Sequence, residues 1–133
     1  MAGARARGDA KATLTLRLNL APRGAVGPGK IKLLELVGET GSISAAGRAM
    51  AMSYRRAWLL IDELNHLFDR PLVETQLGGK AGGGATLTAL GKKLVGAYRA
   101  MEDEAHAVCG RRLQMLQSHR AKAGARQRAK TAV

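Results

Sequence analysis

Four consecutive residues carry side chains suited to contacting a polyanion: Ser53, Tyr54, Arg55 and Arg56. An arginine guanidinium can donate two parallel hydrogen bonds to guanine, and serine or tyrosine hydroxyls can donate to phosphate oxygens. The glycine-rich segment 78–84 holds Lys80, and glycines let a backbone approach phosphate closely. Ser42 and Arg48, on a predicted helix before this cluster, are two further candidates for phosphate contacts. These residue types predict contact with a nucleic acid.

Each assignment has a plainer alternative. On an isolated helix, Arg55 and Arg56 would form a solvated charged face. Lys80 could lie in a loop that only water contacts, and Ser42 is favoured as a helix cap because its hydroxyl can accept a free backbone N–H. The sequence around these residues therefore has to decide between the two interpretations.

No arrangement that supports a reaction accompanies them. Gly79-Lys80 has neither the glycine five residues before Gly79, where Glu74 stands, nor the following Ser or Thr of a phosphate-binding P-loop. His66, His106 and His119 are dispersed, without metal-ligand spacing. The lone Cys109 cannot form a disulfide within the chain, which favours a reducing compartment. We expect neither an enzyme nor a cofactor or metal site.

Composition also favours a nucleic-acid partner. The chain has 133 residues, enough for one domain with tails, and a formal net charge of +12. From Arg111 to Val133 there are seven Lys or Arg residues and no acidic residue. Such an excess of positive charge indicates a polyanionic binding partner. The alternative is that the charge only keeps the protein soluble. The N-terminus lacks an apolar signal region and no stretch resembles a membrane span, so we expect a cytoplasmic, nucleoid-associated protein without membrane contact.

The pattern along the chain predicts the elements that position these groups. Residues 1–12 form a disordered arm, and 14–20 alternates as a strand with one buried face. A loop at 21–29 precedes a helix at 30–40, which ends at a glycine, and a short helix follows at 43–50.

Ser53 is predicted to cap the next helix, which Pro71 stops. On this helix the apolar residues that predict a core stripe are Ala57, Ile61, Leu64 and Phe68. Trp58 stands next to that stripe and is expected to be in the core, the alternative being an exposed residue that stacks on a ligand.

Two strands, at 72–77 and 85–88, flank the glycine loop and predict a hairpin. A long helix follows from Thr88, which is its predicted cap. Apolar residues recur at intervals of seven along it, as in a helix that pairs with a second helix. The residues that we assign to a dimer interface are Leu87, Leu90, Leu94, Ala97, Met101 and Val108. The alternative is packing of this helix against its own domain.

In this order, the elements are those of a winged helix-turn-helix, in which the second short helix enters the major groove and the hairpin lies against the backbone or minor groove. Residues 41–49 and 53–58 resemble the N-terminal DNA-binding domain of the molybdate-responsive ModE family, and more distantly the LysR-type winged helix. The glycine loop followed by Leu87, Thr88 and Gly91 is characteristic of the ModE group. The resemblance covers about residues 14–101 and departs from the family at Ala51, where a glycine is usual.

The resemblance implies a mainly helical fold with a small hairpin wing and a long dimerisation helix. The expected organisation is an arm at 1–12, a DNA-binding domain at 13–88, a dimerisation helix at 89–119 and a disordered basic tail at 120–133. The resemblance further implies a regulator of molybdenum uptake or molybdoenzyme genes that binds a palindromic operator as a homodimer, or as a heterodimer with a longer relative.

Three other functions are weaker. The first is a non-specific or architectural DNA-binding protein, for which the charge alone is sufficient. The second is a molybdate-sequestering protein, which would need an anion pocket that the sequence does not indicate. The third is an enzyme.

Deleting residues 120–133 should flatten the dependence of DNA affinity on salt, because the deletion removes five Lys or Arg residues. Each lost phosphate contact reduces the magnitude of the slope of log affinity against log salt by roughly 0.9. Fluorescence anisotropy of a labelled duplex over a salt series measures this slope. An unchanged slope would show that the tail does not contact DNA.

Overall fold

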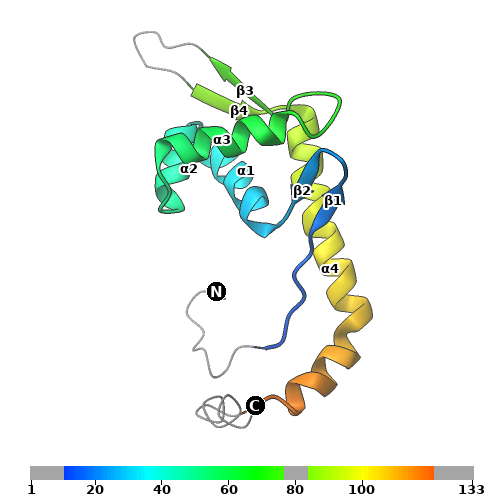
Figure 1. Ribbon diagram of the computed structural model, residues 1–133. Coiled ribbons are helices and arrows are strands. Elements are labelled where there is room, and N and C mark those ends of the chain that lie inside the picture. Colours follow the sequence, from blue (N-terminus) through cyan, green and yellow to red (C-terminus); the bar gives the residue numbers. More distant parts are fainter. Residues whose placement is uncertain (1–10, 77–83, 122–133) are drawn as a thin grey trace. The chain divides into compact units, whose positions relative to one another are not determined.

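The computed structural model describes residues 11–76 and 84–121, which contain four helices and two antiparallel hairpins (Figure 1). The elements in chain order are β1 (Leu18–Leu20), β2 (Gly24–Val26), α1 (Pro28–Thr40), α2 (Ile43–Ala49), α3 (Tyr54–Asn65), β3 (Val73–Gln76), β4 (Gly84–Leu87) and α4 (Ala89–Ser118). The predicted fold class, mainly helical with a small hairpin, is confirmed. No helix in the described residues combines the length and apolar character that a membrane span requires.

The described residues fall into two units. Residues 15–102 form the larger one, which contains both hairpins, α1 to α3 and the first part of α4. Residues 11–14 and 103–121 belong to the second. The arm and tail predicted at 1–12 and 120–133 lie almost entirely outside the described residues.

Two expectations from the sequence are wrong in the region of the first hairpin, which β1 and β2 form. Only the last part of the strand predicted at 14–20 is a strand, namely β1. The loop predicted at 21–29 contains β2, which pairs antiparallel with β1 so that Leu20 lies opposite Gly24. Gly24 has a φ of 149°, which glycine adopts readily and other residues rarely do. A three-residue strand is too short to show alternation, so Pro22 and Gly24 indicate only a loop.

The three predicted hydroxyl caps are all present. In each, the hydroxyl oxygen accepts a backbone N–H from three residues later: Ser42 from Ala45 at 3.0 Å, Ser53 from Arg56 at 3.1 Å and Thr88 from Gly91 at 3.0 Å. These bonds satisfy donors that the first turn of a helix leaves free. Helix α1 begins two residues earlier than predicted, at Pro28, and ends before Gly41, whose φ is 72°.

Helix α3 ends at Asn65, well before the predicted stop at Pro71. The Asn65 side chain explains this end. Its Oδ1 accepts the backbone N–H of Leu72 at 2.8 Å and of Val73 at 3.0 Å, and its Nδ2 donates to the Val73 carbonyl at 3.1 Å. The amide thereby bonds to the start of β3 as a neighbouring strand would, and fixes α3 to the second hairpin.

The core of the larger unit is formed by buried apolar residues of α1, α2, α3, the start of α4 and the two hairpins. The predicted stripe on α3 is confirmed, since Ala57, Ile61 and Leu64 are buried, while Phe68 is partly buried against them. From α4, Tyr98 is completely buried and its hydroxyl donates to the Leu16 carbonyl at 2.7 Å. Burial raises the pKa of the Tyr98 hydroxyl, which keeps it a donor.

An ion-pair network joins α4 to α1 at the edge of this core. Arg99 donates two hydrogen bonds to the Glu35 carboxylate, at 2.9 and 2.7 Å, and a third to Glu102 at 2.8 Å. Hydrogen bonding from Arg99 holds the pKa of the Glu35 carboxyl below its ordinary value. The two parallel bonds fix the rotation of α4 relative to α1 more strictly than a single contact would.

In the first part of the predicted dimer interface, the structure favours the alternative of packing against the helix's own domain. Leu94 is only 8% exposed and belongs to the core of its own chain, while Leu87 and Leu90 pack against that core. Little of these side chains is left for a second chain to cover. Ala97 is exposed and Met101 is partly exposed. Val108, in the second unit, is 77% exposed.

In the second unit, two backbone groups of the segment before β1 bond to side chains of α4. The Leu14 N–H donates to His106 Nε2 at 3.0 Å, and the Ala12 N–H donates to Gln117 Oε1. Only a neutral imidazole nitrogen can accept such a bond. Cys109 is partly exposed on the same helix.

Two glycines of α4 give opposite expectations for stability. A Cβ at Gly91 would stand 2.2 Å from the Leu72 carbonyl oxygen, a backbone atom that cannot rotate away, whereas a Cβ at Gly96 would meet nothing within 4 Å. Gly91→Ala should therefore lower the free energy of unfolding by about 2 kcal/mol or more. Gly96→Ala, the matched control, should raise it by up to about 1 kcal/mol. Urea unfolding followed by circular dichroism measures both, and equal stabilities would contradict the close contact.

Candidate nucleic-acid interface

Helices α2 and α3 form a tight pair joined by the turn at residues 50–53. A Cβ at Gly47 would lie 2.9 Å from the Ala57 Cβ, so the helices touch where α2 has no side chain. In the turn, the N–H groups of Met50 and Met52 both donate to the Gly47 carbonyl, each at 3.0 Å. Ala51 has a φ of 57°, the left-handed conformation in which glycine is usual.

Helix α3 presents its first turns to solvent. Ala57, Ile61 and Leu64 are buried, and residues on the opposite side of the helix are exposed. Arg55 and Leu59 are four residues apart on that outer side, so they lie one above the other. Asp62 follows them in the next turn.

Tyr54 and Trp58 extend the outer surface toward the second hairpin. Tyr54 is 59% exposed and its ring meets the Trp58 ring edge-on, with centroids 6.1 Å apart. The expectation that Trp58 belongs to the core is wrong, since it is 37% exposed. Trp58 is one residue past the buried Ala57, and one residue turns the side chain about 100° around the helix, away from the core.

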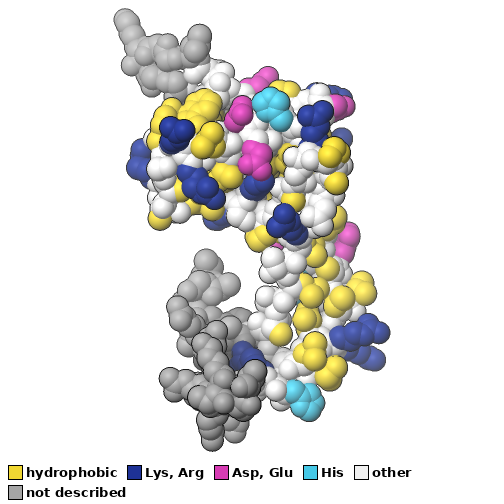
Figure 2. All heavy atoms as spheres, in the orientation of Figure 1, with side chains coloured by type: hydrophobic (Ala, Val, Ile, Leu, Met, Phe, Trp, Pro, Cys, Tyr) yellow, Lys and Arg dark blue, Asp and Glu magenta, His cyan; other side chains and the backbone are white. Residues whose placement is uncertain are grey.

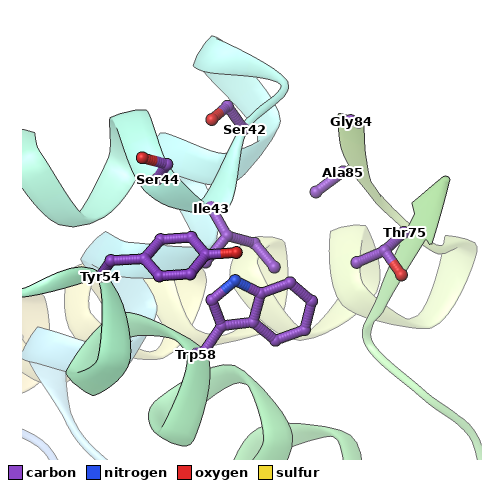
Figure 3. A pocket seen from close by; sticks show the side chains of 8 residues that line it. All are labelled: Ser42, Ile43, Ser44, Tyr54, Trp58, Thr75, Gly84 and Ala85. Carbon is purple, nitrogen blue, oxygen red and sulfur yellow. The ribbon is translucent and has the colours of Figure 1, made fainter. Parts of the chain in front are cut away.

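A hollow of about 170 Å³ lies between these aromatic rings, the start of α2 and the base of the second hairpin (Figure 3). The residues that line it are Ser42, Ile43, Ser44, Tyr54, Trp58, Thr75, Gly84 and Ala85. The Tyr54 and Trp58 rings form one wall, and Thr75 and Ala85 face them from the hairpin. The hydroxyls and the indole N–H of these side chains can donate to a sugar-phosphate backbone.

The structure brings together most of the residues that the sequence indicated. Ser42 and Tyr54 both line the hollow, and Ser53 and Arg55 are the neighbours of Tyr54 in the chain. Arg48 is on the exposed side of α2, where its guanidinium donates to the Ser44 hydroxyl at 2.8 Å. Lys80 lies outside the described residues.

Arg55 and Arg56 face different surroundings. Arg55 lies with Tyr54 and Leu59 around a shallow depression on the outer side of α3. Arg56, about 100° around the helix, borders a separate depression with Met50 and with Glu63, whose carboxylate pairs with Lys30 at 2.7 Å. The two arginines therefore border different parts of the surface of α3.

The sequence did not single out Ser44, Leu59 or Thr75 as candidate contact residues, and it favoured the core for Trp58. Ser44 could have been found from its spacing, since it is four residues before Arg48 on α2. The exposure of Leu59 follows from the phase of the core stripe, in which it is opposite Ala57 and Ile61. Thr75 could not have been found, because its place depends on how the hairpin packs.

Charge is divided along α3 and its surroundings. The first turn carries Arg55 and Arg56 and no acidic residue, while Asp62 and Glu63 follow in the later turns. Figure 2 shows hydrophobic side chains at the surface beside Lys and Arg side chains over the part of the molecule that contains α2 and α3. Within the described residues, no group of three or more His, Cys, Asp or Glu side chains could hold a metal ion.

This geometry agrees with the comparison to known proteins. Residues 29–92 match the model of the family described as bacterial regulatory helix-turn-helix protein, lysR family. The matched residues are similar to a lysR-type helix-turn-helix domain. The matched span runs from the first turn of α1 into the first turn of α4 and includes all of α2 and α3. The family's description is that of regulatory proteins, which agrees with the regulator that the sequence predicted.

Individual relatives extend the match. The chain is 48% identical over 77 residues to the molybdenum-pterin-binding protein MopB of Rhodobacter capsulatus, covering 58% of this chain and 28% of MopB. It is 40% identical over 88 residues to the DNA-binding transcriptional dual regulator ModE of Escherichia coli K12, covering 66% of this chain and 34% of ModE. The chain thus spans about a third of the length of these relatives, and the predicted resemblance to ModE is confirmed.

In a lysR-type helix-turn-helix, α3 occupies the position of the recognition helix, which enters the major groove. Arg55→Ala should therefore relax base preference, reducing discrimination at one position of each half-site by roughly 5- to 150-fold. Arg56→Ala, the matched control, should weaken binding to all duplexes about equally and reduce the magnitude of the salt slope by about 1, because Arg56 lies about 100° around the helix from Arg55, on the side where a phosphate rather than a base edge is within reach. Anisotropy titrations of a selected duplex and its single-base variants measure both, and a uniform loss with Arg55→Ala would exclude base contact by Arg55.

Proposed function

We propose that this chain is a sequence-specific transcription regulator that binds a palindromic operator as a dimer and controls molybdenum-uptake or molybdoenzyme genes. The observation that carries the proposal is the exposed α3 within a lysR-type domain that is 40% identical to a regulator named ModE. That match covers 88 of 133 residues, and any stretch of this length includes α3. A further relative, 44% identical over 75 residues, is named molybdenum transport protein ModE, of Azotobacter vinelandii.

Dimerisation follows from the usual geometry of helix-turn-helix proteins and from exposed apolar side chains on α4. Two recognition helices related by two-fold symmetry contact half-sites about one helical turn of DNA apart. Val108 and Met115, seven residues apart in the second unit, are 77% and 52% exposed. Covering these side chains favours pairing of α4 with a second copy, or with the same helix of a longer relative. The protein acts in the cytoplasm, at the nucleoid.

The net charge of +12 also favours a second candidate, a non-specific or architectural DNA-binding protein. Sequence preference separates the two. A specific regulator keeps its preference for one duplex over a scrambled one as salt rises, because base contacts do not release counterions. A non-specific protein binds both duplexes with equal affinity, and its affinity for both falls as salt rises.

The test is anisotropy of a labelled palindromic ModE-type operator against a scrambled duplex, at two salt concentrations, with sedimentation to give the stoichiometry. We expect two chains per operator and a preference that persists at the higher salt. Equal binding of operator, scrambled duplex and sequences selected from a random library would contradict the proposal. Adding molybdate asks whether this chain itself responds to the oxyanion, and no response leaves that task to a longer partner.

A further inference from the structure

The outer side of α3 is unusually apolar for a surface that meets DNA. Tyr54 is 59% exposed, Leu59 is 57% exposed and Trp58 is 37% exposed. Single exposed apolar residues are common, but these three border one shallow depression, together with Arg55 and Asp62. An apolar group of this size on a small protein indicates a ligand with an apolar part.

Leu59 has the most outward position of the three. Ala57 and Ile61, two residues before and after it, are buried, so Leu59 points away from the core. Arg55, one turn earlier, lies on the same side of the helix. When α3 lies in the major groove, these two side chains face the floor of the groove, where the base edges are exposed.

Among the base edges in the major groove, thymine alone offers a methyl group, and the others offer hydrogen-bond donors and acceptors. A leucine placed against a donor or acceptor would leave that group without a partner, which is costly. Against a methyl group it loses nothing and buries apolar surface on both sides.

Charge at the start of α3 favours DNA as the occupant. The first turn carries Arg55 and Arg56 without an acidic residue, and these cations attract the phosphates that line both edges of the groove. Asp62 borders the same depression two turns later and is an acidic partner that a second copy would offer to Arg55, so sedimentation of the free protein tests that alternative.

We infer that Leu59 contacts the 5-methyl group of a thymine in the major groove, flanked by Tyr54 and Trp58, and so sets sequence specificity. This inference rests on the proposed function and assigns part of the operator. One helical turn rises about 5.4 Å and one base-pair step about 3.4 Å. The base contacted by Arg55 therefore lies one or two steps from that thymine.

The experiment begins with selection of tight-binding duplexes from a random library by the full chain. In the selected duplex, each dT is replaced singly by dU, which removes only the methyl group and keeps base pairing. We expect one position in each half-site at which dU lowers affinity about fourfold, as the loss of one buried methyl group implies. That position should lie within two steps of the position at which Arg55→Ala relaxes preference.

Leu59→Ala assigns this effect to its residue. The variant should bind dT and dU duplexes equally at that position, and keep its discrimination at the others. Alanine favours helix, and circular dichroism verifies that the fold is kept. The matched control is Leu116→Ala, which removes the same atoms from a side chain that is 59% exposed on α4, and should retain the difference between dT and dU.

The outcomes separate the two proposals. If the protein selects a sequence but dU has no effect at any position, or an effect that persists in Leu59→Ala, the inference is wrong and the regulator function stands. If Leu59→Ala weakens every duplex equally or alters the sedimentation of the free protein, Leu59 has a packing or assembly role instead. If no sequence is selected, the proposed function fails and the inference fails with it.

Discussion

The surface formed by α2 and α3 depends on the close approach of these helices at Gly47. There a Cβ would stand only 2.9 Å from that of Ala57, so any larger residue would push α3 outward. The Gly47 carbonyl also accepts two N–H groups from the connecting turn. The same residue thus sets the distance between the helices and the path of the chain between them. Ala51 completes the turn in a left-handed conformation that costs an alanine about 1 kcal/mol.

From this contact, the rest of the interface follows outward. The Ser53 cap begins α3 at a defined residue, and Asn65 fixes its other end to β3. The N–H of Ala85 in β4 donates to the Gly41 carbonyl at 2.9 Å, which places the hairpin beside the start of α2. Both ends of α3 are therefore held, and its outer side is presented as a rigid surface. Rigid placement matters because hydrogen bonds to base edges tolerate little displacement.

The sequence predicts well what is determined locally. Hydroxyl caps at Ser42, Ser53 and Thr88 require only a few neighbouring residues, and all three are present. The stripe on α3 is also local, because its period fixes which side is buried. The residue pattern predicted the order of the elements, and the family resemblance together with the arginines predicted the interface on α3.

Features that depend on packing were missed or wrong. A period of seven at Leu87 and Leu94 shows that one side of α4 is covered, but it does not distinguish a partner helix from the helix's own domain. In the structure, the core of the same chain covers Leu94. The size and hydrophobicity of Trp58 predict a core residue, whereas its position on the helix relative to Ala57 predicts the exposure that the structure shows. Strand β2 has three residues and no pattern of its own, so only its pairing with β1 defines it.

Charge and shape contribute differently to recognition by this chain. The net charge of +12 attracts any duplex, and this attraction falls as salt rises. Discrimination has to come from groups that meet base edges, and those on the outer side of α3 are few. An arginine and a leucine one turn apart are complementary in this respect, since one satisfies acceptors and the other a methyl group. An arginine is unfavourable against a methyl group, and a leucine is unfavourable against a hydrogen-bond acceptor. Two such side chains on a fixed helix therefore exclude more sequences than a larger number of phosphate contacts could.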